Sequence, residues 1–209
     1  MKIVLLIILL FSLISCGGGS STASNIDDNN GLQNNPSITV ENCISTNQVG
    51  LKKCDLLHDN RERFYYIYTP ENLNSNQSIP VLFAFHGYGS SASRHMSYTN
   101  YMQIADENNF VIVYPQGATT PTLSAHWNVG GWTSKSTVKD IEFIETVINL
   151  IQDKIQIDQS RIYSSGMSNG GYMGYHLACN LSEKFAAIAS VTGSMTCLLY
   201  TSPSPRDTL

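Results

Sequence analysis

A short apolar segment that runs directly into a G-x-S-x-G motif constrains the fold of this chain more than any other sequence feature. The stretch is R-I-Y-S-S-G-M-S-N-G-G-Y-M-G-Y-H, from Arg161 to His176. Its apolar start predicts a strand, and the residues after the motif predict a helix. A serine on the turn between such a strand and helix is exposed above a sheet. The pattern therefore predicts that Ser168 is a nucleophile, with Gly166 and Gly170 allowing the tight turn.

The rest of the chain alternates between apolar strand patterns and helical patterns. Strands are predicted at 63–69, 81–85, 111–114, 161–165 and 186–192, helices at 98–108, 140–155 and 169–181, and a long loop at 115–138. Strands that alternate with helices form βαβ units. We therefore expect an α/β fold, with a mostly parallel sheet that carries helices on both faces.

A second motif, H-G-Y-G, follows the predicted strand V-L-F-A-F. Gly87 would let the backbone turn so that the N–H of Tyr88 faces the serine, as in an oxyanion hole. The N–H of Asn169, at the start of a helix, would point to the same place with help from the helix dipole. The alternative for His86 and Gly87 is a plain turn that ends a strand.

Four blocks of this sequence together resemble a known family. They are V-L-F-A-F-H-G-Y-G, H-W-N-V-G-G-W, D-I-E-F-I-E-T-V-I and R-I-Y-S-S-G-M-S-N-G-G-Y-M-G-Y-H-L-A-C-N. The chain from 63 to 195 is similar to the polyhydroxybutyrate depolymerase and feruloyl esterase group, which are secreted ester hydrolases of the α/β-hydrolase fold. The resemblance implies a serine esterase that needs no cofactor or metal and acts through an acyl-enzyme on a polyester or plant-polysaccharide ester: hydroxybutyrate, feruloyl or acetyl.

The resemblance also implies roles for individual residues. Ser168 would be the nucleophile, and Tyr88 and Asn169 would supply the oxyanion N–H groups. His86, Trp127 and Trp132 would border the substrate cleft. The alternative, that both tryptophans only pack, stays open.

The partners of the serine are harder to place. In this fold the acid and then the histidine follow the nucleophile along the chain. Only His176 follows Ser168, and by helical rise it lies about 12 Å along the exit helix, facing away. The last residues, C-L-L-Y-T-S-P-S-P-R-D-T-L, neither continue the pattern nor resemble the family. We expect a partial hydrolase domain at 41–196, a foreign tail at 197–209 and an inactive fragment; the alternative is a natural divergent end.

The N-terminus carries an export signal. A basic start and an apolar run end in L-I-S-C, which resembles a bacterial lipobox with Cys16 as the lipid attachment site. Residues 1–16 would be the signal peptide, and the polar, Asn-rich stretch 17–40 a flexible tether. We expect an exported protein that meets a bacterial membrane, with the outer membrane favoured, only through its lipid, or an extracellular one. The alternative is an ordinary secretory signal in which the cysteine is incidental.

The remaining cysteines indicate which disulfides are possible, and the net charge indicates which binding partners are not expected. In an exported chain Cys43 and Cys54 suit a disulfide, although two unrelated thiols fit the sequence as well. Cys179 is expected as a small buried residue, and no Cys/His spacing is typical of a metal site. The net charge is −4 and there is no basic run, so nucleic acid is not an expected partner. The sequence does not indicate an oligomeric state.

Two other function classes fit the sequence. A serine peptidase of the same fold would carry the same strand-turn-helix motif. A non-catalytic surface lipoprotein could instead bind polysaccharide with Trp127 and Trp132.

Overall fold

The chain divides by its internal contacts into two units, Met1–Ser37 and Ile38–Leu209. The computed structural model describes residues 40–195, all within the second unit. The predicted signal peptide with Cys16, nearly all of the tether and the tail at 197–209 lie outside the described residues.

A mixed seven-stranded sheet forms the centre of the described region, in the order β1-β2-β3-β5-β4-β8-β9. The strands are β1 (Glu41–Ser45), β2 (Leu51–His58), β3 (Arg61–Tyr68), β4 (Ile79–Phe85), β5 (Val111–Pro115), β8 (Ile157–Met167) and β9 (Ala187–Val191). Strands β5, β4, β8 and β9 are parallel, whereas β1, β2 and β3 form an antiparallel extension that pairs with β5. The predicted α/β fold is confirmed, but β1 and β2 were not predicted and they make the sheet mixed.

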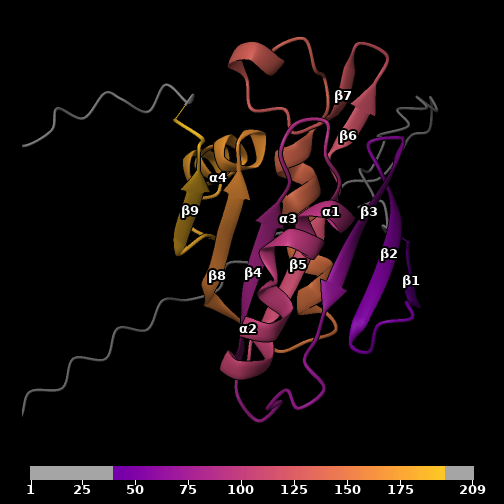
Figure 1. Cartoon of the computed structure of the whole chain (residues 1–209), viewed down its shortest axis with the longest axis vertical. Coiled ribbons are helices and arrows are strands. Elements are labelled where there is room, and N and C mark those ends of the chain that lie inside the picture. The colour runs from indigo at the N-terminus through magenta and orange to yellow at the C-terminus, as the bar shows by residue number, and fades with distance from the viewer. Residues whose placement is uncertain (1–39, 196–209) are drawn as a thin grey trace, which may run out of the picture. The chain divides into compact units, whose positions relative to one another are not determined.

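Helices cover both faces of the sheet, as predicted (Figure 1). Helices α1 (Ala92–Thr99) and α2 (Tyr101–Asn108) pack on one face, and α3 (Asp140–Gln152) and α4 (Asn169–Asn180) on the other. The single helix expected at 98–108 is in fact the end of α1 followed by α2. Asn100 separates them with a φ of 52°, a left-handed conformation that asparagine tolerates better than most residues.

The long loop expected between β5 and α3 contains some regular structure. It holds a two-stranded hairpin, β6 (Ala118–Thr120) with β7 (Leu123–His126), and a short 3₁₀ turn, η1 (Gly131–Thr133). In Figure 1 these elements lie at the end of the sheet where β8 leads into α4. The loop is therefore placed beside the G-x-S-x-G motif.

The central strands separate two apolar cores. Val111 and Val113 of β5 point into the core beneath α3 and α4, while Ile112 and Tyr114 point into the core beneath α1 and α2. All four side chains are fully buried. A strand that is covered on both faces has no polar side, which is why this segment reads as an unbroken apolar run.

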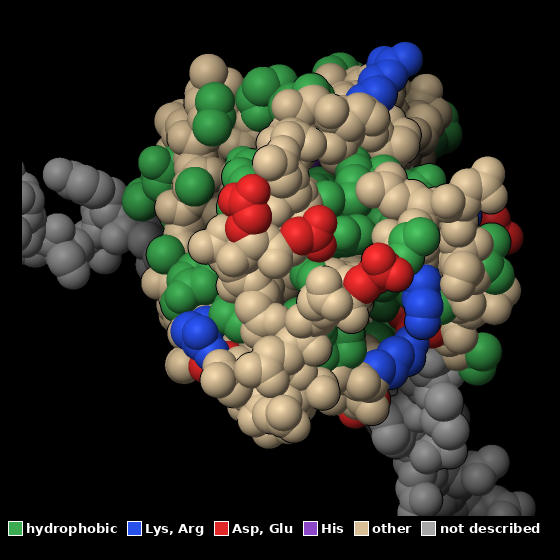
Figure 2. Space-filling view, turned by 60° about the horizontal axis from the view of Figure 1, so that its bottom comes forward, with side chains coloured by type: hydrophobic (Ala, Val, Ile, Leu, Met, Phe, Trp, Pro, Cys, Tyr) green, Lys and Arg blue, Asp and Glu red, His purple; other side chains and the backbone are tan. Residues whose placement is uncertain are grey.

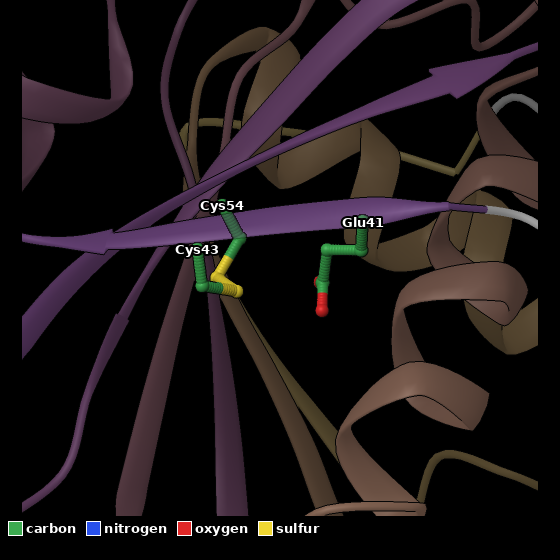
Figure 3. A group of neighbouring side chains, drawn as sticks. All are labelled: Glu41, Cys43 and Cys54. Carbon is green, nitrogen blue, oxygen red and sulfur yellow. A yellow bond between two sulfur atoms is a disulfide. The ribbon is translucent and has the colours of Figure 1, made fainter.

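The predicted disulfide between Cys43 and Cys54 is confirmed. The two cysteines lie opposite each other on β1 and β2, and the Glu41 carboxylate lies beside them (Figure 3). Because the two sulfur atoms are bonded to each other, this trio offers no thiolate to a metal. Glu41 instead accepts a hydrogen bond from the Tyr65 hydroxyl and pairs with Lys154.

Cys179 differs from its prediction. It is half-buried rather than buried, and it is disulfide-bonded rather than a simple packing residue.

Basic and acidic side chains both occur on the face shown in Figure 2, where they lie among apolar ones. This view is that of Figure 1 turned so that its bottom comes forward. Within residues 40–195, no helix combines the length and apolarity needed to cross a membrane.

Candidate active site

Ser168 lies on a sharp turn between β8 and α4, as the sequence predicted. Its φ of 53° and ψ of −120° form a backbone conformation that is strained for any residue with a Cβ. Two backbone hydrogen bonds hold the turn: the N–H of Ser168 donates to Val191 O at 2.7 Å, and the N–H of Tyr172 donates to Ser168 O at 3.0 Å. The sheet and the helix together thus fix a serine that remains half-exposed.

The two glycines of the motif are required by close packing around this turn. A Cβ on Gly166 would lie 2.3 Å from Gly170 O, and a Cβ on Gly170 would lie 2.1 Å from Phe85 O. Both distances are far inside van der Waals contact. The contact between Gly170 and Phe85 shows that the first turn of α4 packs directly on the end of β4.

The H-G-Y-G segment packs against the same turn. A Cβ on Gly87 would lie 3.6 Å from Ser168 Cβ. The segment is held by the N–H of Gly89, which donates to Ala125 O at 2.7 Å, and by the N–H of Ser90, which donates to Gly87 O at 3.2 Å. Neither bond uses the N–H of Tyr88.

The start of α4 provides the other set of donors. The N–H groups in the first turn of a helix have no partner within the helix, and Asn169 is the first residue of α4. The structure thus brings the Tyr88 and Asn169 segments together at Ser168. This arrangement suits the predicted oxyanion role of both residues, which stays a prediction.

His86 does not border a cleft, and that expectation is corrected. Its side chain is fully buried, with Nδ1 placed 2.8 Å from Gly87 O and Nε2 accepting from the Gly117 N–H at 2.9 Å. Burial lowers the pKa of His86. A neutral imidazole with both nitrogens occupied stabilises the loop and is not free to take a proton from the serine.

Trp127 is also fully buried, so its indole cannot contact a substrate. Its ring packs edge-on against Phe85, with centroids 5.1 Å apart. The indole N–H donates to His86 O at 2.9 Å. For Trp127, therefore, the packing alternative is correct and the cleft assignment is wrong.

Trp132 is 49% exposed and contacts Tyr88, which is 43% exposed. Their rings meet edge to face, with centroids 5.3 Å apart. Beyond the serine, the exposed side chains of Tyr98 and Met167 are in contact, with the Tyr98 hydroxyl 3.9 Å from Met167 Sδ. Ser168 thus lies among exposed aromatic and apolar side chains, and Trp132 remains a candidate cleft residue.

No histidine among residues 40–195 forms a hydrogen bond with Ser168, although all five histidines of the chain lie in that range. Their hydrogen-bond partners lie elsewhere: Thr146 for His58, Gly87 and Gly117 for His86, Tyr98 for His95, Ser124 and Ser136 for His126, and Asn180 for His176. Burial lowers the pKa of His95 to about 4. His176 contacts the end of its own helix, which agrees with the prediction that it faces away from the serine.

The structure does contain one serine–histidine pair that the sequence did not suggest. His126 Nε2 lies 2.7 Å from Ser136 Oγ, and His126 Nδ1 lies 2.8 Å from Ser124 O. Both side chains are buried, and Ser136 Oγ also accepts from the Val138 N–H at 3.3 Å. These bonds fold the loop between β7 and α3, so the pair has a structural role.

Sequence reasoning also missed the ion pair that anchors this loop. Asp140 Oδ1 pairs with Arg63 Nη2 at 2.7 Å, and Asp140 Oδ2 accepts from the Asn128 N–H at 2.7 Å. Asp140 also lies in the first turn of α3, where a carboxylate suits the helix dipole. The available signal was Arg63, a charged residue at the start of an otherwise apolar strand pattern.

The chain matches known proteins in sequence and in fold. Residues 96–205, more than half of the chain, match the model of the prolyl oligopeptidase family, Peptidase_S9. The chain is 35% identical over 130 residues to feruloyl esterase B of Thermothelomyces thermophilus, a match that covers 61% of this chain and 43% of that protein. It is 32% identical over 131 residues to a bifunctional acetylxylan esterase/xylanase of Neocallimastix patriciarum, covering 63% of this chain and 18% of that protein. The chain thus spans less than half the length of these two relatives.

Solved structures show the same fold. The acetyl xylan esterase from Aspergillus awamori superposes with a TM-score of 0.52 at 22% identity, over 61% of this chain and 46% of that one. An S-formylglutathione hydrolase from Agrobacterium tumefaciens superposes with a TM-score of 0.59 at 19% identity, over 71% and 61%. These matches confirm the α/β-hydrolase fold and the expected resemblance to feruloyl esterases. The chain belongs to the prolyl oligopeptidase family.

Proposed function

We propose that this protein is a serine esterase that cleaves carboxylic esters of plant polysaccharides. The observation that carries the proposal is the strained, half-exposed Ser168 between β8 and α4, next to the H-G-Y-G segment. Ser168 Oγ attacks the acyl carbon and forms a tetrahedral intermediate, the alcohol leaves, and water hydrolyses the acyl-enzyme. The N–H groups of Tyr88 and Asn169 stabilise the negative oxygen.

The general base comes from outside residues 40–195 in this proposal. The supporting observation is that the five histidines are all engaged away from Ser168. Without a base a serine hydroxyl stays protonated, and loss of one triad member costs several orders of magnitude in rate. The 209-residue chain alone should accordingly show little or no turnover.

The substrate class follows from relatives and from exposed aromatic side chains. The relatives are named feruloyl and acetylxylan esterases, and the half-exposed Tyr88 and Trp132 rings offer an aromatic surface to a sugar or aryl ring. Feruloyl and acetyl esters are therefore the preferred substrates, with hydroxybutyrate polyesters as a further candidate.

An exported, lipid-anchored location is part of the proposal. The disulfide between Cys43 and Cys54 supports an oxidising compartment, and the L-I-S-C sequence supports attachment through Cys16. Growth in an alkyne-labelled fatty acid tests this: the label should enter the protein and should be lost in Cys16→Ser. Equal labelling of both would refute the anchor.

A serine peptidase is the second candidate, because the matching family model is that of a peptidase family. A panel of substrates separates the two with the protein translated from the complete gene. Methyl ferulate and p-nitrophenyl acetate should be hydrolysed far faster than an alanyl-prolyl p-nitroanilide. Faster cleavage of the anilide would overturn the esterase and favour the peptidase.

A non-catalytic polysaccharide-binding protein is the third reading. It loses support because Trp127 is buried, which leaves one exposed tryptophan rather than two. Such a protein would hydrolyse no ester in the panel.

A further inference from the structure

Trp127 connects the two segments that carry the predicted oxyanion donors. Its indole N–H donates to His86 O at 2.9 Å, two residues before Tyr88. Its backbone N–H donates to Asn169 Oδ1 at 2.7 Å, and Asn169 Nδ2 donates back to Trp127 O at 3.1 Å. One residue of the loop between β7 and α3 is thus bonded to both halves of the site.

These three bonds are shielded from water. Trp127, Asn169 and His86 are each fully buried, and the indole packs against the rings of Phe85 and His86, with both centroids 5.1 Å away. Hydrogen bonds are stronger in such surroundings, and a buried partner left unpaired is costly. The connection is therefore stiff as well as direct.

The two donor segments need a constraint of this kind. The brace consists of the three hydrogen bonds that link Trp127 to His86 and Asn169. Tyr88 follows β4 and Asn169 follows β8, so the donors lie far apart in sequence. Donors must lie within about 2.7–3.1 Å of the position of the oxyanion, and small misplacement lowers the rate steeply. Sheet pairing sets the ends of β4 and β8, but the segments beyond those ends require a separate constraint.

We infer that Trp127 is a positioning residue, which sets the distance between the Tyr88 and Asn169 N–H groups through its indole and its backbone. The inference rests on the proposed function for its effect on catalysis. It predicts that removing the brace weakens transition-state stabilisation while substrate binding, which uses exposed surface, is largely retained.

Trp127→Phe tests this in the protein from the complete gene, because phenylalanine fills most of the space and lacks the donor. We expect kcat on p-nitrophenyl acetate to fall by about 10- to 100-fold, with KM changed by less than about 3-fold. Asn169→Ala keeps the backbone N–H but removes both side-chain bonds, and should act in the same direction. Since both changes break one brace, the double variant should lose less than the product of the single losses.

Tyr65→Phe is the matched control. It removes a buried hydroxyl that donates to Glu41, on a strand that does not contact the serine, and should leave kcat unchanged even where it lowers stability. A raised KM with unchanged kcat in Trp127→Phe, or an equal fall of kcat in the control, would overturn the inference.

Amide hydrogen exchange in the 209-residue chain tests the brace without any turnover. Trp127→Phe should speed exchange of the Gly117 N–H, which is bonded to the His86 ring, by about 10-fold or more, and Asn169→Ala should do the same for the Trp127 N–H. Unchanged exchange at both amides would refute the brace. If the wild-type protein failed to hydrolyse esters, the proposed function would fall, and the exchange result would still decide on the brace.

Discussion

Arg63 and Asp140 form an ion pair almost wholly removed from solvent, with Nη2 2.7 Å from Oδ1 and side chains that are 3% and 1% exposed. The guanidinium also lies 3.8 Å from the centre of the Phe143 ring and donates to Gln116 O at 3.1 Å. The ion pair joins β3 to the start of α3. Through Asn128 it also holds the loop that carries Trp127.

Breaking this pair should be costly. Asp140→Ala leaves a buried guanidinium without its carboxylate, and we expect it to lower the free energy of unfolding by about 3–5 kcal/mol. Urea denaturation measures the change. Lys139, one position before Asp140, forms an exposed ion pair with Asp59. Lys139→Ala breaks that pair and should have no measurable effect on the free energy of unfolding. Equal losses in the two variants would show that burial does not decide the strength of these pairs.

The glycines of the motif should tolerate no side chain. Gly170→Ala would place a Cβ 2.1 Å from Phe85 O, so we expect at least about 3 kcal/mol of destabilisation or a failure to fold. In Gly174→Ala, on the same helix, the new Cβ would lie 3.2 Å from the Ser164 hydroxyl and 3.8 Å from Ile188 Cβ. This change should be far milder, because alanine favours a helix. Thermal unfolding of both variants checks this, and a stable Gly170→Ala would contradict the packing described here.

The disulfide between β1 and β2 should contribute measurably to stability. The double variant Cys43→Ser/Cys54→Ser should lose about 2–3 kcal/mol, because the unfolded chain gains conformational freedom. The double variant is a sharper test than a reductant, since Cys179 is also disulfide-bonded. If its urea midpoint equalled that of the wild type, the bond would add nothing to the fold.

His95 should make the fold sensitive to acid. Its pKa is lowered from 6.5 to about 4 because burial disfavours the charged ring. Between these values the unfolded chain binds a proton that the native chain does not, so stability is full above pH 6.5 and falls as the pH drops towards 4. We expect His95 to account for about 2 kcal/mol of loss between pH 7 and pH 5.

His95→Gln provides the comparison for that loss. Urea midpoints for both proteins at pH 7 and pH 5 give the difference, and the variant should lose less than the wild type over this range. An equal loss would place the acid sensitivity in other groups.

The fold and the turn that carries Ser168 could be predicted because both leave local patterns. The run V-L-F-A-F and the spaced isoleucines of α3 reflect burial directly, and G-M-S-N-G reflects a turn that only glycines allow. The hydrogen bonds that Trp127 forms with Asn169 and with His86 could not be predicted in this way. An indole that donates to a distant carbonyl and an amide that pairs with a loop depend on tertiary contacts between residues more than forty positions apart.

The antiparallel strands were missed for a related reason. In β2, L-K-K-C-D-L-L-H, charged residues interrupt the apolar positions, and the pairing that makes it a strand comes from β1 and β3. The same holds for Asn100, since a break within a continuous helical pattern is set by how α1 and α2 pack on the sheet. Tertiary context overrides local propensity at both places.

Covalent labelling of the serine is the sharpest test of whether Ser168 is the nucleophile. The protein from the complete gene is treated with a fluorophosphonate, and the modified peptide is identified by mass spectrometry. We expect one adduct on Ser168 that disappears in Ser168→Ala. An adduct on Ser136, the serine that is bonded to His126, or no adduct in a protein that still hydrolyses esters, would contradict it.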